Sequence, residues 1–291
     1  LLLTTGNDNT FIGDRAGSQI TTNGQNTCIG GRAGSQITGQ QNTAVGFFAN
    51  YGASSGNHNT SMGYFALKTA TSGNHNVAIG HKALEDSTNG YENVAVGSHA
   101  GANMTTGNNN VAVGDSALSN TTTGAVNVAL GPSAVNDNTT GSHNIGIGYQ
   151  ALADNTTANY NVAVGSDALR KNTTGGNLVA VGPFALDANT TGTNNIAIGN
   201  AALGAATTQS NNTAVGHRSM NAQTTADQNT AVGADTLFLN QTGEYNTAMG
   251  FMALYNNTAD INVGIGYQAL LANTSGTRNT AVGANALDSV T

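Results

Sequence analysis

Tryptophan is absent from this sequence, and only 8% of its 291 residues carry a charged side chain. The net charge of -7 is spread along the chain without any basic patch, which argues against nucleic acid or an anionic membrane surface as a partner. The single cysteine, Cys28, excludes an internal disulfide framework. No apolar run is long enough to cross a bilayer, so we expect no membrane insertion within this segment.

Low charge and few aromatic residues often accompany disorder, but a short, strict repeat runs through this chain. The unit is Asn161 to Gly165, NVAVG, and its copies are 17 residues apart except for two intervals of 16. The final glycines of the copies are Gly13, Gly30, Gly46, Gly63, Gly80, Gly97, Gly114, Gly131, Gly148, Gly165, Gly182, Gly199, Gly216, Gly233, Gly250, Gly266 and Gly283. Such a period predicts a solenoid in which each repeat forms one coil of a stack.

The residues before each glycine predict a strand. Directly before the glycine stands Ile, Val, Met or Leu, and three places before it stands Thr, Val or Ile. The residue between them is usually Ala. This alternation with period two is typical of a strand with one face in a core. We expect the branched residues to fill the core, and the Ala column to offer a flat second surface to another chain.

Asparagine occupies the position four places before the glycine in every repeat except that of Leu178. An Asn at the entrance of a strand can bond to its own backbone or to the Asn one coil away. We therefore predict a structural ladder of stacked asparagines. Its members include Asn76, Asn93, Asn110, Asn127, Asn144, Asn161, Asn195 and Asn212.

After the glycine come two variable residues, then Ala and usually Leu. In four repeats Gly17, Gly34, Asn50 and Gly101 stand where Leu is expected, and these coils are expected to pack less tightly. The following run NTTG has a β-branched residue before a turn glycine, which predicts a second short strand. It is also a candidate for glycosylation, on nitrogen at Asn138, Asn155, Asn172, Asn189 and Asn273, and on oxygen at Thr139, Thr156, Thr173 and Thr190.

Any receptor contact is expected at the variable corner positions, which also hold all of the charged residues. Large aromatic side chains at these corners form a candidate recognition surface, made of Phe47, Tyr64, Tyr149, Phe184 and Phe251. The competing interpretation of each is a solvated or interchain side chain without a recognition role.

The motif resembles the head repeat of trimeric autotransporter adhesins, and related repeats occur in phage tail fibres. The likeness lies in NVAIG at 76–80, NIAIG at 195–199 and NTAVG at 212–216, and it recurs in phase along the whole chain. The resemblance implies a trimeric parallel β-roll, displayed outside the cell and used for attachment.

Catalysis requires acids, bases or nucleophiles that converge on a pocket, whereas the His and acidic residues here are scattered over variable corners. His58 and His75 share one column and would stack on adjacent coils, but two imidazoles without a third ligand make a poor metal site. We therefore expect no enzyme activity, no metal and no cofactor.

These observations predict an all-β fold, a parallel β-solenoid or β-roll of about seventeen coils of 17 residues, built as one domain over residues 1–291. Because both ends fall within a repeat, we expect a segment of a longer array. The first functional hypothesis is an extracellular, cell-surface or virion tail fibre segment, structural or adhesive, that associates laterally with copies of itself as a homotrimer or filament. Its other expected partners are cell-surface or matrix receptors or glycans. The alternative is a monomeric solenoid that binds ice or carbohydrate.

Overall fold

The computed structural model describes residues 6–52 and 54–289. Each coil contributes one strand of three residues, and no helix occurs among the described residues. The expected all-β parallel solenoid is therefore confirmed. The strands are β1 Thr10–Ile12, β2 Thr27–Ile29, β3 Thr43–Val45, β4 Thr60–Met62, β5 Val77–Ile79, β6 Val94–Val96, β7 Val111–Val113, β8 Val128–Leu130, β9 Ile145–Ile147, β10 Val162–Val164, β11 Val179–Val181, β12 Ile196–Ile198, β13 Thr213–Val215, β14 Thr230–Val232, β15 Thr247–Met249, β16 Val263–Ile265 and β17 Thr280–Val282.

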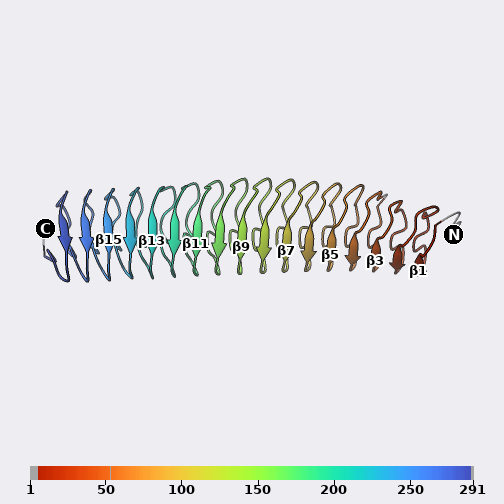
Figure 1. Ribbon diagram of the computed structural model, residues 1–291, viewed down its shortest axis with the longest axis horizontal. Coiled ribbons are helices and arrows are strands. Elements are labelled where there is room, and N and C mark those ends of the chain that lie inside the picture. The colour runs from red at the N-terminus through yellow and green to blue at the C-terminus, as the bar shows by residue number, and fades with distance from the viewer. Residues whose placement is uncertain (1–5, 53, 290–291) are drawn as a thin grey trace. The chain divides into compact units, whose positions relative to one another are not determined.

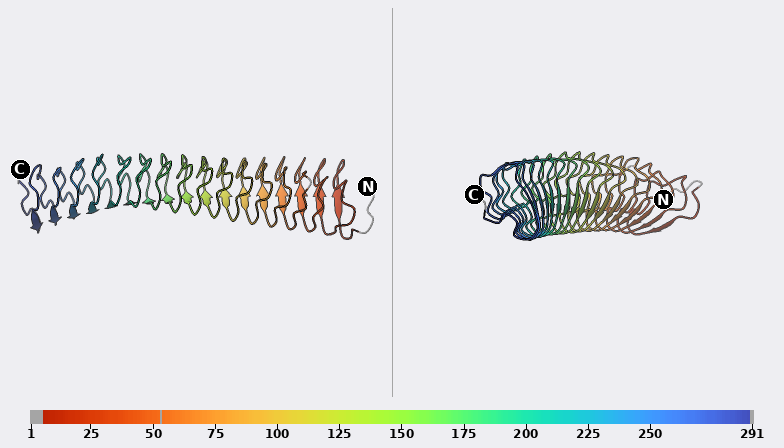
Figure 2. Two further views of the ribbon diagram at one scale, coloured as in Figure 1. Left: turned by 90° about the horizontal axis from the view of Figure 1, so that it is seen from above. Right: turned by 60° about the vertical axis from the view of Figure 1, so that its left-hand side comes forward.

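The chain divides into two compact units, Leu1–Asn144 with β1 to β8 and Ile145–Thr291 with β9 to β17. Within each unit every strand pairs in parallel with the next, and the coils stack in chain order (Figures 1 and 2). The register advances by one whole repeat, as in the pairing of Ala163 with Ala180. The two shorter repeats keep this register, because Thr27 pairs with Thr43 and Thr247 with Val263. The missing residue is therefore absorbed in a turn.

The structure reverses the predicted faces of the strand. The middle residue of each strand points inward: Ala163, Ala180 and Ala214 have no exposed surface. The first and third residues, such as Val162 and Val164, are only partly buried. The expectation that branched residues fill the core and that Ala faces another chain is wrong. The narrow interior of the coil admits a small side chain next to the strand, whereas branched side chains fit outside.

The Leu column supplies the bulk of the core. Its fully buried members include Leu67, Leu84, Leu118, Leu152, Leu169, Leu186, Leu203, Leu237, Leu254 and Leu270. Three coils that carry glycine in this column hold a large apolar residue three places later, namely Ile20, Ile37 and Met104, each about 1% exposed or less. The expected loose packing of those coils is therefore not found. In the coil of Asn50 the amide is buried, and neither of its polar atoms has a hydrogen-bond partner among the described residues.

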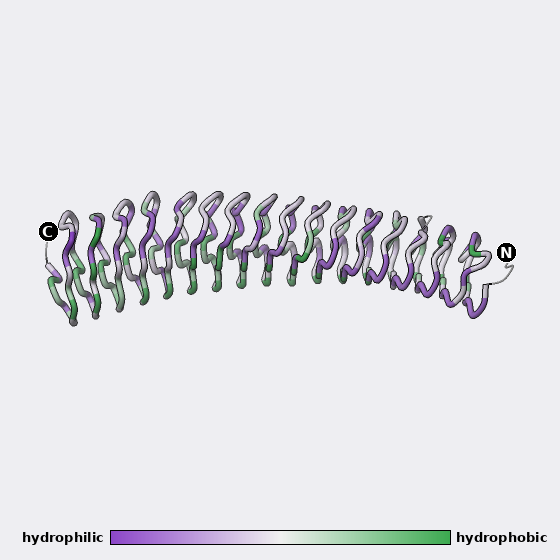
Figure 3. Tube along the Cα trace, turned by 45° about the horizontal axis from the view of Figure 1, so that its top comes forward, coloured by the Kyte–Doolittle hydropathy of each residue, from purple (hydrophilic) through white to green (hydrophobic). Residues whose placement is uncertain are grey.

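The NTTG run forms a turn and not the expected second strand. The N–H groups of Thr122, Thr123 and Gly124 all point to the carbonyl oxygen of Thr139, at 2.9, 3.2 and 3.3 Å. In a strand ladder, successive N–H groups bond to different carbonyls. Convergence of three donors on one acceptor marks a tightly curled corner. Figure 3 shows hydrophobic and hydrophilic stretches along the coils.

Three residues per coil have left-handed backbone conformations and bend the chain around its corners. In the coil that follows β5 these are Lys82, Leu84 and Glu92, with φ of 58°, 49° and 57°. The repeat glycine has a different conformation, with φ of 134° at Gly80. These bends leave the residue before the ladder Asn and the residue after the glycine at the two edges of the strand.

Candidate functional site

The predicted asparagine column forms a hydrogen-bonded ladder inside each unit, interrupted in the second unit by Leu178. The side-chain oxygen of each Asn accepts the backbone N–H of the residue one coil later, as from Asn93 to Asn76 at 3.0 Å. Its amide nitrogen donates to a carbonyl at the end of the same coil, as from Asn93 to Gly107 at 2.8 Å. Equivalent bonds involve Asn76, Asn110, Asn127, Asn144, Asn161, Asn195 and Asn212. Where Leu178 interrupts the column, its backbone N–H still reaches the oxygen of Asn161 at 3.0 Å.

The asparagines of the NTTG run form a second interior ladder. Asn138, Asn155, Asn172, Asn189 and Asn273 are fully buried. Asn172 donates to Asn155 at 3.2 Å and to the Gly175 carbonyl at 2.9 Å, and Asn189 donates to Asn172 at 2.8 Å. A sugar on these nitrogens would have to occupy the core, so the expectation of Asn-linked glycans at these five positions is wrong.

The two threonines of the NTTG run have different environments. The first donates its hydroxyl to a backbone carbonyl one coil later, from Thr156 to Thr173 at 3.0 Å and from Thr173 to Thr190 at 3.0 Å. Thr190 does the same, and Thr139 is half-buried in the same column. The second threonine, such as Thr174 or Thr191, is exposed. A modification of this corner would therefore reach the second threonine more readily than the candidates named from the sequence.

The outer side of the strands is an apolar surface that sequence reasoning missed. It consists of the first and third residues of each strand, together with the entry position just before the ladder Asn and the exit position just after the glycine. We call it the strand face. Apart from Tyr91, Phe184, Leu239 and Leu287, every large hydrophobic residue that the described structure exposes lies on it. These residues are Ile12, Phe47, Met62, Tyr64, Val113, Val126, Ile147, Tyr149, Tyr160, Ile196, Ile198, Tyr245, Met249, Phe251, Ile261, Tyr267 and Val282.

Column composition carried the missing signal. The middle column of the strand admits Ala, Gly, Ser and Cys, with Phe11 as its one large member. The outer columns admit Thr, Val, Ile, Met and Leu. The outer columns contain both Thr and Val, which is typical of positions partly exposed to water. The middle column is restricted to small residues, which indicates an interior position without room for a larger side chain. Likewise, the column of Asn138 holds Ile20, Ile37 and Met104 in other repeats, which indicates an interior position.

Four of the five proposed recognition residues lie at exit positions on the edge of the strand face. Phe47, Tyr64, Tyr149 and Phe251 expose 44–52% of their surface. Neighbouring coils stack these rings: Phe47 and Tyr64 lie 5.9 Å apart between centroids, and Phe251 and Tyr267 lie 5.8 Å apart. Phe184 is one residue further along and lies outside the strand face. The structure thus places Phe47 and Tyr64 on the strand face of the first unit, Tyr149 and Phe251 on that of the second, and Phe184 outside it.

Chemically reactive groups do not gather in this fold. Within residues 6–52 and 54–289, no three His, Cys, Asp or Glu side chains form a group that could hold a metal ion. His58 and His75 stack in parallel with ring centroids 4.7 Å apart. The lone pairs of parallel rings do not converge on one point, as metal coordination requires. Burial raises the pKa of the Cys28 thiol to about 12, so it stays protonated and unreactive at neutral pH.

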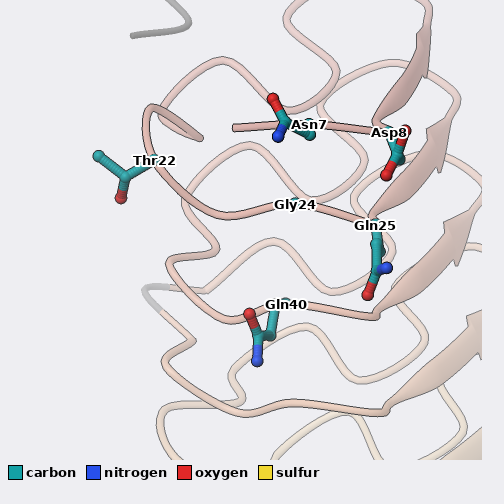
Figure 4. A pocket seen from close by; sticks show the side chains of 6 residues that line it. All are labelled: Asn7, Asp8, Thr22, Gly24, Gln25 and Gln40. Carbon is teal, nitrogen blue, oxygen red and sulfur yellow. The ribbon is translucent and has the colours of Figure 1, made fainter. Parts of the chain in front are cut away.

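An open polar hollow of about 310 Å³ lies beside the first coils. It is lined by Asn7, Asp8, Thr22, Gly24, Gln25 and Gln40. Thr22 and Gln25 lie at opposite ends of it, so its polar groups do not converge (Figure 4). No helical segment of the described chain is long and apolar enough to cross a membrane.

Comparison with known proteins gives no match to a protein family, to a curated protein or to a solved structure.

Proposed function

We propose that this chain is a non-enzymatic, extracellular structural segment of a fibre, and that it associates laterally with copies of itself through the strand face. The observation that carries the proposal is the gathering of exposed large hydrophobic residues on that one surface. The proposed fibre is a cell-surface fibre or a virion tail fibre, as the resemblance of the repeat to adhesin heads and phage tail fibres implies.

The size of the surface supports self-association. In the second unit the exposed large residues of the strand face include Ile147, Tyr149, Tyr160, Ile196, Ile198, Tyr245, Met249, Phe251, Ile261, Tyr267 and Val282. At half exposure such side chains present on the order of 800 Å² together. The largest apolar patch on a typical monomer is roughly 300–600 Å², and a standard interface buries about 800 Å² on each partner. This surface is therefore large enough to hold a second copy.

Charge supports the same partner. The first and third residues of the described strands are Thr, Val, Ile, Met and Leu without a charged side chain. Among the described residues, the strand face carries charge only at entry and exit positions, at Asp8, Asp14, Glu92, Asp115 and Arg278. The uncharged strand residues between these edges do not repel one another, and contacts between identical apolar faces are common in homo-oligomers. Charged residues lie at the corners, where they keep the assembly soluble.

The adhesive part of the proposal concerns the exposed aromatic residues. Phe184 lies outside the strand face and would remain open to a receptor after association. Phe47 and Tyr64 lie on the strand face, so association would cover their stacked rings. Glycosylation remains compatible with the fold at the exposed second threonines of the NTTG corner.

The decisive experiment compares the mass in solution of two double variants. Val164→Lys with Val181→Lys places two charges on the strand face, where burial of an unpaired charge would prevent association. Thr174→Lys with Thr191→Lys adds the same charge on an exposed corner away from the strands. Multi-angle light scattering should show an oligomer for the wild type and the corner variant, and a monomer for the face variant. A monomeric wild type, or a face variant that still associates, would overturn the proposal.

Ice binding by a monomer is a second candidate, and a different part of the structure now favours it. In β13 and β14 the outward residues are Thr213 and Val215, then Thr230 and Val232, which makes a regular array of hydroxyl and methyl groups at the spacing of neighbouring strands. The paired threonines of the NTTG corner do not form such an array. A measured thermal hysteresis that Thr213→Lys abolishes would support this candidate, and its absence in the wild type would remove it.

A further inference from the structure

The two edges of the strand face carry matching side chains on the same coil. Where the exit position is aromatic, the entry position is aromatic or apolar on five strands. The pairs are His58 and Tyr64 on β4, His75 and His81 on β5, His143 and Tyr149 on β9, Tyr245 and Phe251 on β15, and Ile261 and Tyr267 on β16. On other strands both positions are small or polar, as with Asn177 and Pro183 on β11, Asn194 and Asn200 on β12, and Gln228 and Ala234 on β14. Three strands break the rule, since a ring at one edge lies across from a polar or small residue on β3 (Gln41 and Phe47), β10 (Tyr160 and Ser166) and β13 (Asn211 and His217).

Contacts within one chain do not explain this matching. The entry and exit positions of one coil are six residues apart on either side of a strand of three residues, a distance along the chain of at most about 20 Å. Each side chain instead stacks along its own edge, as Phe251 does on Tyr267. Matching across the strand requires a partner that brings the entry edge of one coil next to an exit edge.

Building on the proposed self-association, we infer that two copies pack strand face to strand face, in parallel and in register, about a two-fold axis along the direction in which the coils stack. Rotation about such an axis exchanges the two edges but keeps the height along the stack. The entry position of each coil then lies opposite the exit position of the same coil in the other copy. In the second unit, Ile261 of each copy meets Tyr267 of the other, and Tyr245 meets Phe251.

The shape of the surface favours two copies over the expected three. Each described coil presents its strand on one side, so each unit of a copy offers one apolar sheet surface. Two such sheets pack about 10 Å apart and cover each other completely. Three flat faces arranged around an axis would enclose a central space, and the side chains around it would lose dispersion contacts.

Two coils near the N-terminus do not fit the contact. On β1 both edges are acidic, with Asp8 at entry and Asp14 at exit. The two-fold arrangement would bring these carboxylates together, so contact is expected beyond that coil. On β3 the entry position opposite Phe47 is Gln41, and the Phe47 ring packs on Tyr64 of the next coil instead.

Charge complementation tests the arrangement on β16. Ile261→Lys with Tyr267→Lys should weaken the dimer, because two pairs of like charges meet across the interface. Ile261→Lys with Tyr267→Glu should bind at least about tenfold more tightly than the Lys–Lys variant at low salt. The matched comparison is with Ile261→Lys alone: adding Tyr267→Glu should strengthen binding relative to that single variant, whereas adding Tyr149→Glu, whose charge lies on a different coil, should not. Sedimentation velocity measures the dissociation constant and the mass together.

The outcomes separate this inference from the proposed function. If only the variant with Ile261→Lys and Tyr267→Glu on the same coil regains tight binding, and its mass is that of two copies, the two-fold arrangement is supported. A wild-type protein that associates without recovery on β16, or that has the mass of three copies, overturns the arrangement and leaves self-association standing. An antiparallel pair would bring the entry edge of β16 opposite the entry edge of a coil at the other end of the stack, and would give no recovery. A monomeric wild type refutes both.

Discussion

The side-chain oxygen of Asn76 accepts the backbone N–H of Asn93 at 3.0 Å, and the side-chain oxygen of Asn93 in turn accepts the N–H of Asn110 at 2.9 Å. Each side chain thus joins its own coil to the next. Because the column is buried, no water can replace a lost partner. The ladder therefore acts as a second set of inter-coil bonds beside the strand pairing.

Replacement of Asn93 by Ala should lower the free energy of unfolding by about 2–5 kcal/mol. The substitution leaves the Asn110 N–H and the Gly107 carbonyl buried without their side-chain partner, at about 1–3 kcal/mol each. Thr106→Ala, at an exposed corner of the same coil, should cost less than about 0.5 kcal/mol. Urea unfolding followed by circular dichroism measures both. Equal losses would contradict the role of the ladder.

Replacement of Gly46 by Ala should lower stability more than the same change at Gly283. Both glycines have positive φ, 129° and 127°, and a side chain with a Cβ would meet backbone strain of about 1–2 kcal/mol at either position. A Cβ at Gly46 would lie 2.6 Å from the Gly63 carbonyl oxygen, whereas a Cβ at Gly283 meets nothing closer than 4.0 Å. We expect a loss above about 3 kcal/mol at Gly46 and about half of that at Gly283. Thermal unfolding checks the order, and a larger loss at Gly283 would refute it.

Stability should fall at alkaline pH through Cys28. Its pKa rises from 9.0 to about 12 because of burial, so the unfolded chain ionises first. The contribution of the protonated thiol is complete below pH 9 and is lost as the pH rises towards 12. Cys28→Ala places the usual residue of that column and should remove this part of the pH dependence. The measurement is the difference in unfolding free energy between the two proteins from pH 8 to pH 11, and a constant difference would contradict the prediction.

Period and column composition predicted the strand of each coil and the asparagine ladder. The glycine spacing defined the coil, and the fixed Asn indicated a repeated bond. The faces of the strand could not be derived from alternation alone, because a period of two shows which residues share a side but not which side is inward. Val164 looked like a core residue, although the narrow coil has room only for Ala163 beside the strand.

The position of the NTTG asparagines could not be predicted from the sequence, because they lie in a polar part of the coil interior. Asn172 belongs to a sequon-like run, and the polarity of the run suggested an exposed corner. The structure buries Asn172 because stacked amides satisfy one another, so a polar column can lie inside. The sequence of the NTTG turn also resembles that of a strand, because β-branched threonines occur in strands and in this turn. Only the hydrogen bonds distinguish the two structures.

The inward orientation of Ala and the outward orientation of the branched residues underlie both the core and the strand face. Substitutions at two adjacent residues test these orientations directly. Ala163→Val should lower the unfolding free energy by about 2 kcal/mol, because the packed interior has no room for two more methyl groups. Val164→Ala, the next residue of β10, should cost less than about 1 kcal/mol in the isolated chain because it is partly exposed. Unfolding at a concentration that keeps the chain monomeric measures both. A larger loss for Val164→Ala than for Ala163→Val would contradict the account.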